Sequence, residues 1–428
     1  MAKRCLIVCY YFPPIGGGGV QRILKWIKYG THLGWRYTVV TADENSDIQP
    51  LDDSLLEEVP ESTRVIRKPA HIGGKNTNSL LNRFMHSRGH YYWKRWVSAF
   101  LYLPDSRKHW IKTAEQTILK EIRKNKYDCV LCSAPPYSIL ILATRLQKKI
   151  SQPVIADMRD YWTKYPFKIY PTAIHKWIDR KIEDKTLSRI NFGISAYHGL
   201  LADIQKRFPN SNARWIYIPN GYDEDDFTNL EDNILNNGYF NMAIAGTLYS
   251  HLTTPRSLFK AIHALLKTYP ELRSKIRLHY IGKTFIALSE LARKYGIEDV
   301  VVRHGYMQHK KYLNLLNSMD TLIFILDHNK LMGSSPVGGR VFEYIRLRKP
   351  ILALVPENGE AARIIRQTRS GIVISPRDVD SITQVLSEWM TCKPQFLFED
   401  IKQYNRELQA ETINAFIEQI IQSKNNVA

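Results

Sequence analysis

The sequence predicts an α/β protein built from two tandem, doubly wound domains, each with a parallel sheet. Short apolar runs, typical of strands buried on both faces, alternate with stretches of helical apolar spacing. A polar segment that begins at Asn220-Gly221 interrupts this alternation, which then restarts. The length of 428 residues is also enough for two or three domains.

The first domain is expected to span residues 1–222. An apolar run at 6–11 predicts its first strand, and helical spacing over 20–27 predicts the helix that follows. Further apolar runs predict strands at 37–41, 129–133, 153–157 and 191–195, with helices between them. Because strand and helix alternate, these strands should lie parallel in one sheet.

The second domain is expected to span residues 223–398, after an acidic and Asn-rich linker. Its predicted strands are 242–246, 276–281, 300–303, 322–326, 351–355 and 372–375, and its predicted helices include 258–266, 311–316 and 340–346. Residues 399–428 lie outside this repeat. Within them, 400–423 has the pattern of one long amphipathic helix, which we expect to pack back on the first domain.

Composition and charge favour a globular protein with an anionic partner. Hydrophobic residues make up 44% of the chain, which argues against a disordered or collagen-like protein. The 60 Lys and Arg outnumber the 41 Asp and Glu, so the formal net charge is +19. Such a surplus suits nucleic acid, a phosphorylated substrate or an acidic membrane surface. No secretory signal is evident and no apolar run approaches the ~20 residues of a membrane span, so we expect a cytosolic or peripheral protein.

The cysteines do not suggest a metal or redox centre. There are five, and Cys129 and Cys132 form a C-x-x-C inside a predicted strand. Residues three apart on a strand point to opposite faces of the sheet. Core packing is therefore the favoured interpretation of this pair.

A run of four glycines, Gly16, Gly17, Gly18 and Gly19, follows the first predicted strand and opens a helix. Glycines let the backbone approach a ligand closely, and a helix N-terminus offers unpaired N–H groups to a phosphate. A plain strand-to-helix turn is the alternative, although it needs fewer glycines. The run has neither the dinucleotide-binding pattern nor the P-loop pattern.

Two carboxylates, Asp157 and Asp160, flank Arg159 just past the end of another apolar strand. Ligands of open α/β sheets bind at this edge, and paired carboxylates can transfer protons or orient a hydroxyl group. The alternative is a loop ion pair with an N-capping aspartate.

A third cluster, at 334–344, contains small residues that lead into a predicted helix. Arg340 would lie in the first turn of this helix, where a purely structural cation is disfavoured, so an anion is its expected partner. Glu343 could accept two hydrogen bonds from a vicinal diol such as a ribose, or it could simply face solvent.

Read in order with Asn220-Gly221, Ala245-Gly246-Thr247 and His304-Gly305-Tyr306, these motifs resemble those of retaining, nucleotide-sugar-dependent glycosyltransferases of the GT-B fold, specifically glycosyltransferase family 4. The resemblance implies two Rossmann-like domains that face a central cleft. It also implies that the donor binds mainly to the second domain and the acceptor mainly to the first.

The resemblance further implies the roles of individual residues. Asp157 and Asp160 would lie close to the transferred sugar as the catalytic candidates. The implied donor-binding residues are Gly16, Gly17, Gly18, Gly19, Gly246, Thr247, Arg256, Lys283, Ser335, Gly338, Gly339, Arg340 and Glu343.

The chain departs from the family pattern at two of these positions. Ser335 stands where the first glutamate of the Glu-x7-Glu motif is expected, and Thr247 stands where the family clamps the diphosphate with a cation. Arg256, Lys283 or Arg340 could replace that cation. Cations and helix N-termini would stabilise the leaving diphosphate, so we expect no metal and no cofactor, the nucleotide-sugar being a substrate.

A basic and aromatic stretch lies between the strands predicted at 37–41 and 129–133. Trp and Tyr suit a lipid headgroup interface, and Lys and Arg suit anionic lipid. Its residues, predicted to form a membrane or acceptor patch, are Arg83, Arg88, Tyr92, Trp93, Lys94, Arg95 and Trp96. An ordinary surface remains an alternative, and binding of single-stranded nucleic acid is the least favoured one.

The leading hypothesis is therefore a retaining glycosyltransferase that moves a sugar from a nucleotide-sugar to a glycan or lipid-linked acceptor. The pathway implied by the resemblance is cell-surface polysaccharide or lipopolysaccharide biosynthesis. The expected location is the cytoplasm, with peripheral attachment to the inner face of the cell membrane. The alternatives are a GT-B-fold nucleotide-sugar epimerase and a non-catalytic sugar-nucleotide-binding protein.

Overall fold

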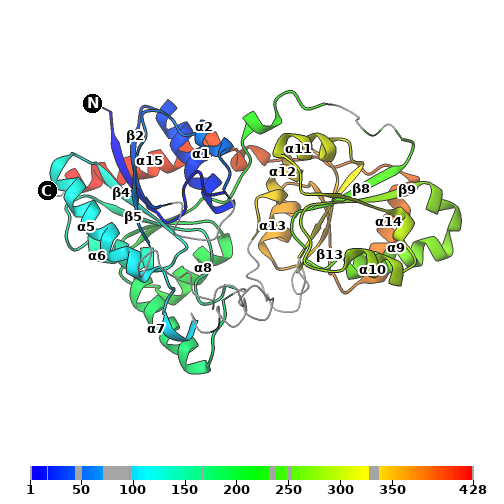
Figure 1. Cartoon of the computed structure of the whole chain (residues 1–428), viewed down its shortest axis with the longest axis horizontal. Helices are drawn as coiled ribbons and strands as arrows, with labels where there is room; N and C mark the ends of the chain where they lie inside the picture. The colour runs from blue at the N-terminus through cyan, green and yellow to red at the C-terminus, as the bar shows by residue number, and fades with distance from the viewer. Residues whose placement is uncertain are drawn as a thin grey trace, which may run out of the picture. The chain divides into compact units, whose positions relative to one another are not determined.

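The structure is a computed structural model that describes residues 2–16, 18–43, 51–70, 96, 99–165, 168–231, 235, 237–248, 253–326 and 337–426 (Figure 1). The chain divides into two compact units. Unit 1 comprises Met1–Pro219 together with Arg406–Ala428, and unit 2 comprises Asn220–Asn405. The sequence places these two boundaries at 222/223 and 398/399.

Unit 1 is built on a seven-stranded parallel sheet with the strand order β3-β2-β1-β4-β5-β6-β7. The strands are β1 (Arg4–Cys9), β2 (Arg36–Ala42), β3 (Arg64–Lys68), β4 (Cys129–Ala134), β5 (Val154–Met158), β6 (Phe192–Ser195) and β7 (Arg214–Tyr217). The helices are α1 (Gly18–His32), α2 (Ser54–Glu57), α5 (Lys108–Lys124), α6 (Ser138–Leu146), α7 (Ala173–Leu187), α8 (His198–Arg207) and α15 (Arg406–Asn425).

The centre of this sheet is β1, which pairs with β2 on one side and with β4 on the other. The order of the strands along the chain reverses here, and such a switch point is where open α/β sheets bind ligands. Residues 5–9 of β1 are buried. Cys129 and Cys132 are free thiols buried in β4, which confirms that they belong to the core.

The edge strand β3 and the short helix α2 are absent from the sequence-based prediction. In β3, Val65 and Ile66 lie between Arg64 and the pair Arg67-Lys68, so no apolar run marks this strand. Charged residues are common on edge strands because they discourage pairing with another chain.

Helix α15 returns to unit 1 and packs on α1. Ile413, Ile417 and Ile420 recur at helical spacing and join the same apolar core as Ile23 and Ile27 of α1. The prediction of one helix over 400–423 is wrong at its start. Residues Ile401–Tyr404 form a separate 3₁₀ turn, η5, and the carbonyl of Tyr404 accepts a hydrogen bond from the Tyr222 amide (2.9 Å) instead of continuing a helix.

Unit 2 is built on a six-stranded parallel sheet with the strand order β10-β9-β8-β11-β12-β13. The strands are β8 (Phe240–Ala245), β9 (Ile276–Ile281), β10 (Val301–Gly305), β11 (Thr321–Ile325), β12 (Ile351–Leu354) and β13 (Gly371–Ile374). The helices are α9 (Arg256–Thr268), α10 (Leu288–Lys294), α11 (His309–Asn317), α12 (Arg340–Arg346), α13 (Glu360–Gln367) and α14 (Val379–Thr391), with 3₁₀ turns η2 (Glu224–Phe227), η3 (Pro270–Ser274) and η4 (Glu298–Val300).

One face of this second sheet is covered by α9, α10 and α14, whose apolar side chains form a core with β8, β9, β11 and β12. Figure 1 shows helices on both faces of each sheet, as expected for doubly wound domains. The predicted fold class is thus confirmed. Among the helices that the structure describes, none has the length and apolar composition needed to cross a bilayer.

Candidate functional site

The candidate site residues fall into two groups, one at the carboxyl edge of each sheet.

In unit 1, Arg159 connects the segments that follow β1, β4 and β5. This buried arginine donates hydrogen bonds to the carbonyls of Gly19 and Pro135 (2.7 Å), and also to the carbonyl of Ala134 (3.2 Å). A Cβ atom at Gly19 would lie 2.6 Å from Arg159 Nη1, so the first turn of α1 packs directly on the guanidinium. A side chain at position 19 would therefore have to displace the Arg159 guanidinium from these hydrogen bonds.

Asp157 is fully buried at the end of β5 and is saturated with hydrogen bonds. Arg22 of α1 donates to Oδ1 through Nη2 (3.0 Å) and Nε (3.2 Å), and Ser133 Oγ donates to Oδ2 (2.7 Å). The same guanidinium donates to the carbonyl of Pro219 (2.9 Å). This geometry matches the ion-pair alternative for Asp157 and makes it a residue that positions α1 and β5.

Asp160 lies beyond the strand end and is only partly buried. Its Oδ1 accepts a hydrogen bond from Tyr197 Oη (3.3 Å). Burial raises the pKa of the Asp160 carboxyl to about 6, even though Arg159 and Tyr197 act in the opposite direction. A carboxyl group with this pKa exchanges its proton near neutral pH, which suits general acid–base chemistry.

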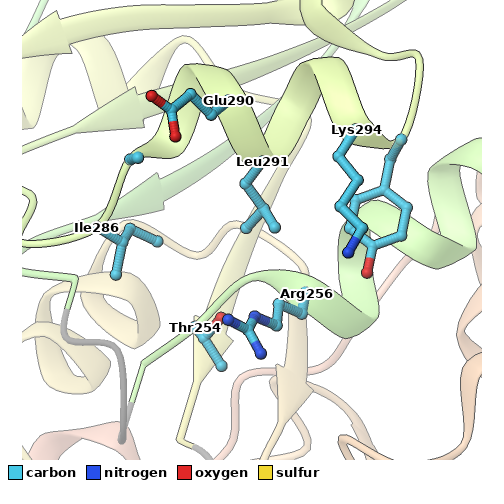
Figure 2. Close-up of a pocket in the computed structure, with 8 residues that line it drawn as sticks. Thr254, Arg256, Ile286, Glu290, Leu291 and Lys294 are labelled. Carbon is cyan, nitrogen blue, oxygen red and sulfur yellow. The ribbon is translucent and has the colours of Figure 1, made fainter.

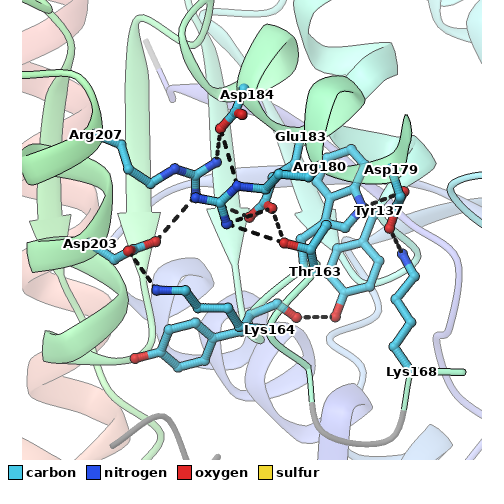
Figure 3. A network of polar contacts seen from close by, with 12 residues as sticks. Tyr137, Thr163, Lys164, Lys168, Asp179, Arg180, Glu183, Asp184, Asp203 and Arg207 are labelled. Carbon is cyan, nitrogen blue, oxygen red and sulfur yellow. Dashed lines mark hydrogen bonds and ion pairs between the residues drawn. The ribbon is translucent and has the colours of Figure 1, made fainter. Parts of the chain in front are cut away.

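The loop after Asp160 is anchored by a polar network on α7 and α8 (Figure 3). The ring of Trp162 stacks on Tyr137 at 5.2 Å, and its Nε1 donates to Asp179 Oδ1 (3.0 Å). Thr163 donates to Glu183, and Lys164 pairs with Asp203 at 2.8 Å. Because three consecutive side chains are held in this way, the backbone around Asp160 has little freedom.

In unit 2, three glycines with left-handed backbone angles stand at the carboxyl ends of adjacent strands. The φ angles are +101° at Gly246, +141° at Gly282 and +69° at Gly305. The Gly246 amide donates to the carbonyl of Ile281 and the Gly282 amide to that of Gly305, both at 2.7 Å. The loops after β8, β9 and β10 are thereby joined into one backbone edge.

Arg340, the first residue of α12, lies against this edge. Its guanidinium donates to the carbonyl of Ala245 and occupies the space that a Cβ atom at Gly246 would need. The structure therefore brings the predicted residues Gly246 and Arg340 together. Gly338 and Gly339 precede the helix and have open space where a Cβ atom would stand.

Glu343, one turn into α12, is held by two side chains of α11. Tyr312 Oη donates to Oε2 (2.9 Å), and His309 Nε2 lies 3.2 Å from Oε1. Burial by itself would raise the pKa of Glu343, but His309, Tyr312 and Arg340 outweigh it and lower the pKa below its usual value. The carboxylate is thus ionised at neutral pH and only 21% exposed, which excludes the solvent-facing alternative.

His309 and Tyr312 are not among the site residues that the sequence predicts. They lie three apart at the start of α11, directly after the His304-Gly305-Tyr306 motif that closes β10. A helix that starts at the carboxyl end of a strand presents its first turn toward the edge of the sheet where ligands bind. The position of these two residues just after a predicted strand is therefore the feature of the sequence that could have indicated them.

Two other predicted cations occupy different surroundings. Lys283 Nζ lies 5.2 Å from the ring of exposed Tyr306. Arg256 begins α9 and lines a cavity of about 330 Å³ whose other wall is α10 (Figure 2). That cavity is also lined by Thr254, Ile286, Glu290, Leu291 and Lys294.

The structure describes some of the remaining predicted residues. Gly16 and Gly18 flank the start of α1, and Thr247 follows Gly246. Trp96 is described and exposed. The predictions for Gly17, Arg83, Arg88, Tyr92, Trp93, Lys94, Arg95 and Ser335 lie outside the described residues.

Solved structures share this architecture along nearly the whole chain. A glycosyltransferase from Rickettsia africae ESF-5 has a TM-score of 0.60 at 12% identity, over 99% of this chain and 98% of that chain. The apo form of the lipopolysaccharide outer core galactosyltransferase WaaB has a TM-score of 0.62 at 12% identity, over 97% and 99%. An α,α-trehalose-phosphate synthase from Burkholderia xenovorans, in complex with glucose-6-phosphate, has a TM-score of 0.62 at 11% identity, over 97% and 100%.

These likenesses and the two parallel sheets define the protein as one of GT-B fold, with two Rossmann-like domains. Residues 250–408 match the family described as Glycosyl transferases group 1, and this match supports a glycosyltransferase. No curated protein matches the chain.

Proposed function

We propose that this protein is a retaining glycosyltransferase that transfers a sugar from a nucleotide-sugar to a glycan or lipid-linked acceptor. The observation that carries the proposal is the ionised Glu343 carboxylate, held from both sides at the carboxyl edge of the unit 2 sheet beside Arg340. It lies in the segment that matches Glycosyl transferases group 1.

Glu343 would bind the donor ribose. Tyr312 and His309 use one lone pair of each oxygen, which leaves the others to accept hydrogen bonds from two neighbouring hydroxyls. Arg340 and Lys283 would neutralise the charge that develops on the departing diphosphate, without a metal ion. Asp160, with its raised pKa, would act on the acceptor side, where unit 1 supplies the residues.

The wider setting of this reaction is proposed from the sequence. The acceptor would be a glycan or lipid-linked glycan of cell-surface polysaccharide or lipopolysaccharide synthesis. The enzyme would act in the cytoplasm at the inner face of the membrane, with Arg83, Arg88, Tyr92, Trp93, Lys94, Arg95 and Trp96 near the lipid.

The test begins with a thermal-shift screen of UDP-, GDP-, ADP- and CMP-sugars, followed by calorimetry with the nucleotide that stabilises the protein. Glu343→Gln removes the charge that strengthens its hydrogen bonds, at a cost of about 1.5–3 kcal/mol, so donor affinity should fall roughly tenfold or more. Glu271→Gln, an exposed change in the same unit, is the matched control. Unchanged donor affinity in Glu343→Gln would remove this residue from the site.

Sugar transfer then separates the three candidate functions. Incubation with a lipid extract should give a glycosylated product whose anomeric configuration, measured by NMR, is that of the donor. An epimerised nucleotide-sugar formed without acceptor would identify an epimerase. Donor binding without turnover would identify a binding protein.

A further inference from the structure

Six large apolar side chains are exposed together on unit 1. They come from two segments far apart in the sequence and are between 38% and 67% exposed. They are Trp96, Phe100, Leu101, Ile174, Trp177 and Ile178, and we call this set the α7 face. Single exposed apolar residues are ordinary, but a cluster of this kind marks an interaction surface.

Ring contacts join the two segments into one surface. The ring of Trp96 stacks on Phe100 at 5.8 Å, and the ring of Phe100 lies 4.9 Å from that of His175 in the first turn of α7. His175 Nε2 also lies 3.2 Å from the carbonyl of Phe100. The stretch around residue 100 is therefore fixed on α7 beside Ile174.

Helix α7 has two distinct sides. Asp179 and Glu183 are buried and belong to the polar network of Figure 3. Ile174, Trp177 and Ile178 recur at positions i, i+3 and i+4 and point outward. The helix is thus held in place by its polar side, and its apolar side is available to another surface.

The exposed charged side chains that α7 itself contributes beside this face are positive. Lys176, Lys181 and Lys185 are exposed on the same helix, and Lys181 Nζ lies 5.9 Å from the ring of Trp177. The partly exposed acid of α7, Asp184, is paired with Arg207 and Arg180.

The segment of the chain that precedes Phe100 also carries a positive net charge. Residues 62–104 contain no Asp or Glu, and they contain eight Lys and Arg. These are Arg64, Arg67, Lys68, Lys75, Arg83, Arg88, Lys94 and Arg95.

We infer that the α7 face docks on the headgroup region of an anionic bilayer, with Trp177 and Ile178 inserted and the lysines against the lipid phosphates. Aromatic and aliphatic side chains ringed by lysine match such an interface chemically. A second copy of the chain is a poor occupant, because two faces of the same positive sign repel each other.

The experiment is flotation of the full chain with vesicles of phosphatidylcholine alone or with added phosphatidylglycerol, over a range of salt. Wild type should float with the anionic vesicles, and binding should fall with salt but not vanish, since salt does not screen the apolar part. Trp177→Ser with Ile178→Ser should remove the salt-resistant part and weaken binding roughly tenfold or more. Lys176→Glu with Lys181→Glu should weaken binding at low salt by at least roughly fivefold for each lysine.

Matched controls use exposed residues elsewhere. Leu33→Ser with Leu397→Ser removes two exposed leucines, and Lys260→Glu with Lys267→Glu reverses two exposed charges on α9. Both should float as wild type does. Equal flotation of wild type with neutral and anionic vesicles, or unchanged flotation of both α7 variants, would overturn the inference.

Two measurements without vesicles exclude the other occupants. The α7 variants should keep the wild-type melting temperature, and a fall of more than about 3 °C would show that the chain's own residues cover the face. A dimer that dissociates in Trp177→Ser with Ile178→Ser would show that a second copy covers it. The docking inference rests on the membrane setting of the proposed function, so failed flotation would remove that setting. Because flotation needs neither donor nor acceptor, its failure would leave the proposed sugar transfer untouched, and failure of transfer would leave the docking result intact.

Discussion

Replacement by asparagine should lower the stability of the protein at Asp157 but the rate of sugar transfer at Asp160. Asp157→Asn keeps the shape of the side chain but removes the charge that faces Arg22. The guanidinium of Arg22 is 2% exposed and lies 3.0 Å from Asp157, so it would remain buried without a counter-ion. Breaking one side of a buried pair costs about 3–5 kcal/mol.

That cost can be converted into a melting temperature. One kcal/mol shifts the melting temperature of a domain of this size by about 2–4 °C, so Asp157→Asn should lower it by about 6–20 °C. Asp160→Asn removes the charge but keeps an Oδ1 that can accept the 3.3 Å hydrogen bond from Tyr197, so it should change the melting temperature by less than about 3 °C. Its effect should fall instead on the rate of sugar transfer, by about 10²-fold or more if Asp160 transfers a proton.

The assay is differential scanning calorimetry together with transfer rates at a temperature where both variants are folded. Arg22→Met combined with Asp157→Asn is the decisive third variant, because it removes the orphaned charge and should recover part of the lost stability. If the double variant is less stable than Asp157→Asn alone, the unpaired guanidinium is not the cause. If Asp157→Asn melts like wild type but loses transfer, Asp157 is a catalytic residue and the positioning role assigned to it is wrong.

Three further predictions follow from the described geometry. Burial raises the pKa of Asp160 from 3.8 to about 6, so the folded state binds this proton more tightly than the unfolded chain does. The contribution of Asp160 to the free energy of unfolding should therefore be fully present below pH 3.8 and be lost as the pH rises toward 6. Chemical denaturation at several pH values should show that Asp160→Asn lacks this part of the decline. Transfer activity should survive EDTA, because Arg340 and Lys283 supply the positive charge; complete loss that Mg²⁺ or Mn²⁺ restores would refute this. Gly246→Ala forces a Cβ atom onto Arg340 at a φ of +101° and should weaken donor binding at least fivefold in calorimetry, whereas Gly338→Ala, which enters open space, should not; equal affinities in both would contradict the packing argument.

The central part of the fold is predictable because its strands are apolar on both faces. The run at Leu6, Ile7 and Val8 predicts β1 without any tertiary information, because a strand that is covered on both faces has a continuous apolar sequence. An edge strand has no such requirement, and β3 carries Arg64, Arg67 and Lys68 instead. The break between η5 and α15 depends on a hydrogen bond from Tyr222, a residue far away in the sequence, and so no local pattern contains it.

In the candidate site, too, the residues that have a local signal are predictable and those defined by distant contacts are not. The sequence predicts Gly246, Arg340 and Glu343 together because each lies at a strand end or helix start, and parallel strands bring those positions to one edge. It does not predict which side chains contact the candidate residues. Arg22 is separated from Asp157 by 135 residues, and only the folded sheet shows that their contact makes Asp157 a buried support.

The return of α15 to unit 1 sets the order in which the protein can be completed during synthesis. Unit 2 is inserted between Pro219 and Arg406, so the ribosome must translate all of it before the last element of unit 1 exists. Until then Ile23 and Ile27 of α1 lack Ile413, Ile417 and Ile420, and an apolar strip of the nascent first domain faces water. Unit 2 can complete its core earlier, because all the residues of the core cluster formed by its sheet with α9, α10 and α14 lie within residues 220–405. The domain that begins the chain is therefore the one whose core is completed last, and during that interval its exposed apolar strip favours aggregation.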